Sequence, residues 1–165
     1  MIKVGEKLPA GTLREFIEVA TEGCSVGPNE VDVAAATAGK TIALFALPGA
    51  FTPTCSAQHV PGYRDHAEQL KAAGVDEIWC VSVNDAFVMS AWGQSQNAEA
   101  LVMAADGNGE FTQAMGLTLD GSGFGLGHRS SRYALIAEDG KITTLNAEQG
   151  GAFEVSSAEK ILEAL

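Results

Sequence analysis

Short apolar runs alternate along the chain with segments of helical periodicity. Three runs are rich enough in β-branched or aromatic residues to predict buried strands, namely Thr41–Leu47, Glu77–Val83 and Leu101–Ala105. After the first run, apolar and long side chains recur at helical spacing over Tyr63–Ala73, and after the second a helix is predicted over Ala86–Gln94. The middle of the chain therefore predicts strands that alternate with helices.

Hairpin patterns lie on either side of this middle region. The expected strand pairs are Thr12–Val19 with Val31–Val33, and Ser131–Ala137 with Lys141–Leu145. Between the members of the first pair, Gly23–Asn29 has the chemistry of a turn. Together with the alternating region, these strands predict a mixed central sheet with helices on both faces, an α/β fold for which the thioredoxin-like arrangement is the best match.

Local signals mark the ends of several helices. Pro61-Gly62 should kink or interrupt the helix that follows the first strand. Ser156 and Glu159 match a capping box that opens a C-terminal helix. No repeat, low-complexity tract or linker divides the chain, so we expect residues 1–165 to form a single domain.

The composition limits the classes of partner. Hydrophobic residues make up 46% of the 165 residues, which is enough for a folded core. The chain has 10 basic and 21 acidic residues, so its net charge is −11, and neither nucleic acid nor an anionic membrane is an expected partner. The N-terminus lacks the apolar core of a signal peptide and no run approaches the length of a membrane span, so we expect a cytoplasmic protein.

The three cysteines, Cys24, Cys55 and Cys80, stand at irregular spacings. An odd number without a Cys-x-x-Cys pair disfavours a disulfide framework and indicates a reducing compartment. The sequence has no His/Cys cluster with the spacing of zinc ligands, so we expect neither a metal nor another cofactor.

The stretch Pro48–Cys55 directly follows the first buried run. Its two prolines and a glycine stop the strand and delay the helix, whereas the residues after Cys55 are compatible with a helix. Cys55 is therefore expected in the first turn of a helix. Unpaired backbone N–H groups and the positive end of the helix dipole favour a thiolate over a thiol at that position.

Three sequence blocks stand in order between Pro48 and Tyr133. They are Pro48-x-x-x-Thr52-x-x-Cys55 with His59 and Pro61-Gly62, then Ser82–Val88 with Trp92-Gly93, and finally Gly127-x-Arg129-Ser130-x-Arg132-Tyr133. The first block is similar to the active-site pattern of peroxiredoxins, and the three together resemble the peroxiredoxin five subfamily. The resemblance implies a thioredoxin-like fold and thiol-dependent reduction of hydrogen peroxide or organic hydroperoxides.

The resemblance also implies roles for individual residues. Cys55 would be the peroxidatic cysteine, with Thr52 and Arg132 as its partners and Pro48 as a shield of the pocket. The other expected walls of the substrate pocket are Gly49, Phe51 and Thr54. The family further implies a homodimer packed edge to edge near the active sites.

The residue types suit this chemistry. A thiolate attacks one peroxide oxygen while the other leaves as hydroxide or alkoxide, and the product is a sulfenic acid at Cys55. A helix N-terminus or a nearby cation lowers the pKa of a thiol from about 8.5 into the range of about 3.5 to 7.5. Arg132 keeps its charge and offers several donors in one plane. The Thr52 hydroxyl can donate to one reacting atom and accept from another.

Recycling of the sulfenic acid needs a second thiol. Animal members of the subfamily carry a resolving cysteine near the C-terminus, but residues 150–157 contain none here. Cys80 lies in an apolar run, which predicts burial, and nothing places Cys24 near Cys55. We therefore expect a one-cysteine cycle with an external reductant, either glutathione with glutaredoxin or thioredoxin.

Other interpretations of these residues stay open. Cys55 also fits a redox-sensing or holdase protein, in which its oxidation is a signal or a switch and peroxide turnover is not the function. A cysteine hydrolase would need a histidine base held by a third group, and no paired motif indicates one. His59 either tunes the thiolate or packs at an interface, and Arg129 is structural or supports a dimer. The Gly121–Gly127 loop does not follow a strand of a βαβ unit, so it indicates a wall of the pocket and not a nucleotide site.

Overall fold

The computed structural model describes residues 1–17 and 28–165. Within them, seven strands form one sheet in the order β2-β1-β5-β4-β3-β8-β9. The strands are β1 Thr12–Glu15, β2 Asn29–Asp32, β3 Thr41–Ala46, β4 Glu77–Ser82, β5 Val102–Ala105, β8 Tyr133–Glu138 and β9 Lys141–Ala147. The pairs β3–β4 and β4–β5 are parallel and the other four are antiparallel, so the sheet is mixed, as predicted.

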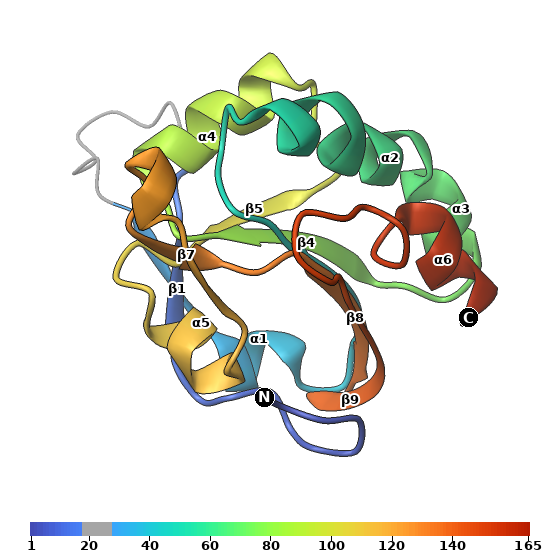
Figure 1. Cartoon of the computed structure of the whole chain (residues 1–165). Helices are drawn as coiled ribbons and strands as arrows, with labels where there is room; N and C mark the ends of the chain where they lie inside the picture. The colour runs from blue at the N-terminus through green and yellow to red at the C-terminus, as the bar shows by residue number, and fades with distance from the viewer. Residues whose placement is uncertain (18–27) are drawn as a thin grey trace, which may run out of the picture.

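Helices cover both faces of this sheet, and Figure 1 shows the two layers. The helices on one face are α2 Val60–Asp65, α3 Ala67–Ala72, α4 Ala86–Ser95 and α6 Ala158–Glu163. The helices on the other face are α1 Val33–Thr37 and α5 Glu110–Met115. The predicted thioredoxin-like arrangement is therefore confirmed.

The central strand β3 is apolar on both sides because it lies between two cores. Ala43, Phe45 and Leu47 belong to the core under α2, α3, α4 and α6, whereas Ile42 and Leu44 belong to the core under α1 and α5. Burial on both faces explains why the sequence shows a continuous apolar run here instead of an alternating pattern.

The helix after β3 departs from the prediction at Pro61-Gly62. Helical residues begin at Pro53, widen into one π-helical turn, η1 Cys55–His59, and continue as α2 through Pro61-Gly62. Proline cannot donate the hydrogen bond of a regular turn and clashes with the carbonyl four residues before it, and the wider turn relieves both constraints. The prediction was a kink or an interruption at Pro61-Gly62; the interruption is wrong, because the helix continues there and its break falls at His66, whose φ and ψ are −100° and 8°.

The cap of the C-terminal helix lies one residue later than predicted. The Ser157 hydroxyl accepts the hydrogen bond from the Lys160 N–H and caps α6. Ser156 is fully buried, and its hydroxyl donates to Glu148 instead. Only Ser156 matches the capping-box pattern, but its burial and its bond to Glu148 leave the adjacent Ser157 to cap the helix.

The predicted hairpins form with changed limits. β1 pairs antiparallel with β2, and β8 pairs antiparallel with β9. The end of the expected first strand, most of the turn at Gly23–Asn29, and Cys24 lie outside the described residues. A two-stranded sheet of β6 Thr118–Asp120 and β7 His128–Ser130 was not predicted; it flanks the glycine-rich loop, which contains the 3₁₀ turn η2 Ser122–Phe124.

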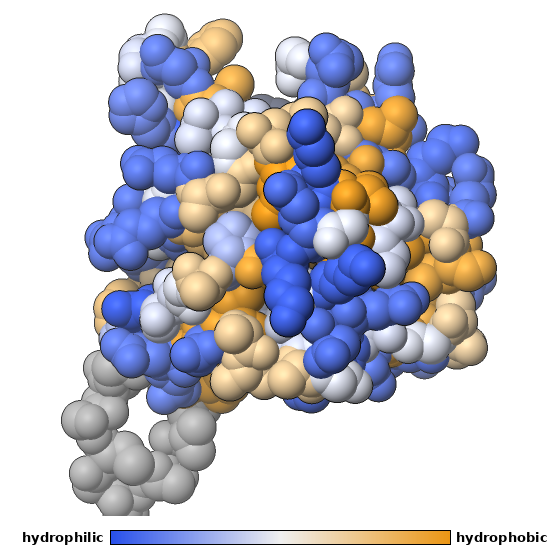
Figure 2. All heavy atoms as spheres, turned by 90° about the horizontal axis from the view of Figure 1, so that it is seen from below, coloured by the Kyte–Doolittle hydropathy of each residue, from blue (hydrophilic) through white to orange (hydrophobic). Residues whose placement is uncertain are grey.

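The face that carries α1, α5 and the N-terminus mixes hydrophilic and hydrophobic residues in small patches (Figure 2). Among the residues that the structure describes, none of the helices has the length and apolar character needed to cross a membrane.

Candidate active site

The loop that carries Cys55 is fastened to the end of β4. The Leu47 N–H donates to the Val81 carbonyl at 3.2 Å, which extends the strand pairing by one residue. The Ala50 N–H donates to Asn84 Oδ1 at 2.9 Å. The Ser82 hydroxyl lies 2.7 Å from Asn84 Oδ1 and 3.3 Å from the Leu47 carbonyl, and it can donate to either. The turn between β3 and the helix is therefore held by polar groups of the neighbouring strand.

Cys55 lies in the first turn of the helix, as the sequence predicts. The Ser56 N–H donates to the Thr52 carbonyl at 3.0 Å, so Thr52 opens the helix, and helical residues follow from Pro53. The N–H groups of this first turn have no preceding helical carbonyl to bind, and they are oriented toward the loop. The Cys55 side chain is buried, with 1% exposure.

Arg132, which directly precedes β8, brings its guanidinium to the Cys55 sulfur. Its Nη2 donates to Cys55 Sγ at 3.2 Å, and its Nη1 donates to His59 Nδ1 at 2.8 Å. Arg132 is only 8% exposed, and its guanidinium carbon lies 5.9 Å from the centre of the Phe153 ring. A guanidinium keeps its charge, so it is a suitable donor to negative charge that develops on a neighbouring atom.

His59 is neutral and accepts a hydrogen bond from the Arg132 guanidinium. Since a guanidinium only donates, Nδ1 must accept from Arg132, and the ring proton sits on Nε2, 3.1 Å from the Ser156 carbonyl. Burial first, and the Arg132 charge second, lower the pKa of His59 to about 3. Both ring nitrogens are engaged, so His59 has no free lone pair to take a proton from Cys55, and the arrangement disfavours a cysteine hydrolase.

The Thr52 hydroxyl can make only one of the two hydrogen bonds to reacting atoms that the sequence predicts. Its hydroxyl donates to the Gly49 carbonyl at 2.7 Å, so the single proton is used within the loop. The oxygen can still accept a hydrogen bond, but it does not donate to the thiolate in this arrangement. Phe51, between these residues, has a positive φ of 61°, which shapes the tight turn.

The expected pocket walls have different environments. Pro48 and Thr54 are half-buried, Gly49 is buried, and Phe51 is 59% exposed. A Cβ at Gly49 would lie 3.1 Å from Nη1 of Arg129 and 3.3 Å from Cγ2 of Thr52, so a larger residue there would require these side chains to shift by a few tenths of an ångström. Arg129 is anchored by its Nε donating to the Leu126 carbonyl at 3.0 Å. Whether these groups contact a substrate stays a prediction.

Sequence reasoning missed several supports of the site. Ser82 ends the buried strand β4 and Asn84 follows it, and this position at the carboxyl end of a strand parallel to β3 was an available signal. The contact of Arg129 with the loop and the bond between His59 and Arg132 had no local signal, since 73 residues separate the latter pair.

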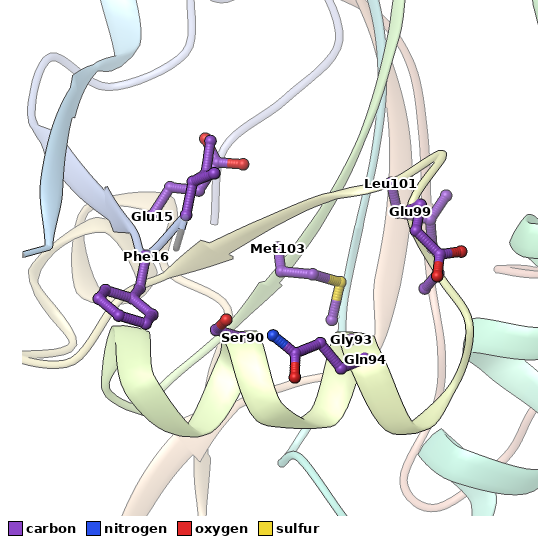
Figure 3. Close-up of a pocket in the computed structure, with 10 residues that line it drawn as sticks. Glu15, Phe16, Ser90, Gly93, Gln94, Glu99, Leu101 and Met103 are labelled. Atoms are coloured by element: carbon purple, nitrogen blue, oxygen red, sulfur yellow. The ribbon is translucent and has the colours of Figure 1, made fainter. Parts of the chain in front are cut away.

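Another pocket, of about 350 Å³, lies between the end of β1, α4 and β5 (Figure 3). Ser90, Gly93 and Gln94 of α4 face Met103 of β5 there. The lining includes the carboxylates of Glu15 and Glu99 but neither a thiol nor a cation, and none of the predicted site residues. Its lining therefore does not support the predicted reaction. Across residues 1–17 and 28–165, no group of three His, Cys, Asp or Glu side chains is arranged to hold a metal ion.

Comparison with known proteins gives one consistent result. A sequence profile of the redoxin family matches residues 3–162. The chain is 52% identical to peroxiredoxin-2E-2, chloroplastic, of Oryza sativa subsp. japonica, over 99% of this chain and 72% of that protein. It is 50% identical to peroxiredoxin-2D of Arabidopsis thaliana, over 99% and 98% of the two chains. The crystal structure of reduced Prx3 from Vibrio vulnificus in complex with hydrogen peroxide superposes with a TM-score of 0.91 at 54% identity, and covers 99% of both chains.

Acid should destabilise the fold through His59. Its pKa is about 3 in the folded chain and 6.5 as an ordinary value, so between these values the folded chain binds fewer protons than the unfolded chain. The stabilisation is complete above pH 6.5 and is lost as the pH falls toward 3, by up to about 1.4 kcal/mol per pH unit. Urea unfolding between about pH 7 and pH 5 measures this slope.

The matched variant is His59→Gln, whose amide can accept from Arg132 and donate to Ser156 without titrating. Its free energy of unfolding should depend less steeply on pH than that of the wild type. Equal slopes for both proteins would contradict the neutral state of His59.

Proposed function

The chain belongs to the redoxin family and is a peroxiredoxin, a thiol-dependent peroxidase, and we propose that Cys55 is the residue that reduces the peroxide. One observation carries this assignment: the Cys55 sulfur lies in the first turn of a helix and accepts a hydrogen bond from the Arg132 guanidinium at 3.2 Å. Two sources of positive potential thus face one buried sulfur.

The proposed reaction is a displacement at oxygen. The Cys55 thiolate attacks one oxygen of the hydroperoxide, the O–O bond breaks, and the other oxygen leaves as hydroxide or alkoxide, which takes up a proton. Sulfur is oxidised to a sulfenic acid and the peroxide is reduced to water or an alcohol. Arg132 stabilises the negative charge on the reacting atoms. The Thr52 oxygen accepts a hydrogen bond from the peroxide, because its own proton is bound to Gly49.

The surrounding loop supplies the proposed pocket. Pro48 shields the sulfur from water, and the other proposed walls are Gly49, Phe51 and Thr54. The hydrogen bonds of Asn84 and Ser82 support this proposal, because they hold the loop against β4 before a substrate arrives.

Replacement of Cys55 should abolish turnover. In an assay coupled to a thiol reductant, Cys55→Ser should consume no hydrogen peroxide above background, because serine is not oxidised. Arg132→Gln should lower kcat/KM by about 10²–10³-fold, the usual cost of a lost transition-state donor. Cys24→Ser and Cys80→Ser serve as controls and should retain the wild-type rate.

Peroxide turnover in Cys55→Ser would reject the assignment. Slow consumption by the wild type, together with large assemblies on oxidation, would instead favour a redox-sensing or holdase protein.

We further propose that an external thiol recycles the sulfenic acid. Cys80 is fully buried in β4, and burial raises the pKa of its thiol well above the usual range, which keeps it unreactive. Residues 150–157 carry no cysteine. The proposed donors are glutathione with glutaredoxin, or thioredoxin, in a reducing compartment such as the cytoplasm.

Intact mass after one equivalent of peroxide tests this cycle. The chain should gain one oxygen as a sulfenic acid, and added glutathione should convert that form to a mixed disulfide. A product that has instead lost two hydrogens would show an internal disulfide and contradict the external cycle. Cys24→Ser and Cys80→Ser identify the partner cysteine in that case.

A homodimer is the proposed assembly of the single domain formed by residues 1–165. Two aromatic rings support it: Phe51 and Phe124 are 59% and 90% exposed. Phe51 belongs to the loop before Cys55, and Phe124 belongs to η2, in the segment that contacts this loop through Arg129 and Gly49. Exposed aromatic residues close to one site are typical of a protein interface.

Sedimentation velocity tests the dimer. Phe124→Glu should shift the sedimentation coefficient toward that of a monomer, because a charge would be buried in the interface. Val4→Glu is the control, since Val4 is 57% exposed in the N-terminal segment. An unchanged coefficient for Phe124→Glu would remove Phe124 from the interface, and a monomeric wild type would reject the dimer.

A further inference from the structure

Glu148, directly after β9, binds a turn of the chain near its C-terminus. Its Oε1 accepts four hydrogen bonds: from the N–H groups of Glu154, Val155 and Ser156 at 2.8, 2.7 and 2.8 Å, and from the Ser156 hydroxyl at 2.8 Å. One carboxylate oxygen thus gathers three successive backbone donors. Such an arrangement fixes the path of the chain between Glu148 and Ser156.

The Ser156 carbonyl points away from Glu148 into the protein. It accepts from the Tyr63 hydroxyl at 2.8 Å and from His59 Nε2 at 3.1 Å. Tyr63 and His59 are both fully buried, so each donor would lose its partner in the interior if this carbonyl moved. The position of the Ser156 carbonyl therefore helps to fix the orientation of His59, whose Nε2 proton it accepts.

Glu148 also contacts the backbone of Arg132. The Glu148 N–H donates to the Arg132 carbonyl at 3.0 Å, while His59 Nδ1 accepts from the Arg132 guanidinium at 2.8 Å. Phe153, within the turn that Glu148 binds, lies 5.0 Å from the His59 ring and 5.9 Å from the guanidinium carbon. The backbone and the charged tip of Arg132 are thus both connected to Glu148.

We propose that Glu148 is a positioning residue that holds the Arg132 guanidinium on the Cys55 sulfur by way of Ser156 and His59. The proposal rests on the proposed roles of Cys55 and Arg132. The Glu148 carboxylate touches neither substrate nor sulfur, and it acts on the guanidinium only through Ser156 and His59. Loss of its carboxylate frees the turn, releases the Ser156 carbonyl, and removes the support on one side of Arg132.

The charge of Glu148 is part of this function. Burial by itself raises the pKa of this carboxyl, but the hydrogen bonds from Ser156, Glu154 and Val155 outweigh burial and lower it. The ionised form is therefore the one that binds the turn. Glutamine retains an oxygen acceptor without the charge, so it should preserve part of the geometry.

The experiment compares Glu148→Ala and Glu148→Gln with Glu154→Ala. The control removes a carboxylate from the same segment, and Glu154 is exposed and contributes only its backbone N–H to the network. The first measurement is the rate of oxidation of reduced Cys55 by hydrogen peroxide in a single turnover. The second is the pH profile of Cys55 alkylation by iodoacetamide in a Cys24→Ser background.

Glu148→Ala should slow oxidation by about tenfold or more and move the midpoint of the alkylation profile to higher pH. Glu148→Gln should show a smaller change of the same sign, and Glu154→Ala should match the wild type. A lower melting temperature of Glu148→Ala with unchanged oxidation and alkylation would show a purely structural role and overturn the proposal. Equal changes in Glu148→Ala and Glu154→Ala would also overturn it, because they would show a general charge effect.

The two readouts separate this inference from the proposed function. The rate of alkylation depends on the reactivity of the Cys55 thiol and not on peroxide consumption. A shifted midpoint of the alkylation profile therefore supports the positioning role even if peroxide turnover fails. If Glu148→Ala does not fold, Glu148→Gln decides by the same two measurements, and a wild-type profile in that variant overturns the proposal.

Discussion

The arrangement of the site depends on one contact, the hydrogen bond from Arg132 to the Cys55 sulfur. A guanidinium that is 8% exposed is costly to bury unless its donors are bound. Here Cys55 and His59 each accept a bond from it, and the Phe153 ring lies beside it. The arginine is thereby held in one orientation before any substrate is present, which is how an enzyme avoids reorganisation during the reaction.

Neutral His59 makes that orientation possible. A protonated imidazole would place a second cation against Arg132 and would lose the lone pair that accepts its bond. Burial and the arginine charge lower its pKa to about 3, so the ring remains an acceptor at neutral pH. The π-helical turn at Cys55–His59 belongs to the same arrangement, since it sets the offset between the sulfur and the imidazole.

Local sequence patterns predicted the strand and the helix start that carry Cys55, but the side-chain contacts of the site depend on residues far apart in the sequence. The strand at Thr41–Ala46 and the start of the helix before Cys55 follow from burial and from proline chemistry, both of which act over a few residues. Arg132 could be chosen over Arg129 only through the family resemblance. The bond between His59 and Ser156 joins residues 97 positions apart, which no local pattern reveals. The break expected at Pro61-Gly62 was misplaced for another reason, because the widened turn at Cys55–His59 accommodates the proline and lets the helix continue.

The burial of Cys80 has a consequence for the time course of oxidation. Of the two thiols that the structure describes, Cys80 is fully buried and lies in β4, which pairs with β3 on one side and with β5 on the other. In the proposed one-cysteine cycle, the oxidised Cys55 would then persist until a thiol from solution reaches it. In that cycle the lifetime of the sulfenic acid would depend on the supply of the reducing thiol, and scarcity of that supply would expose the same sulfur to further, irreversible oxidation.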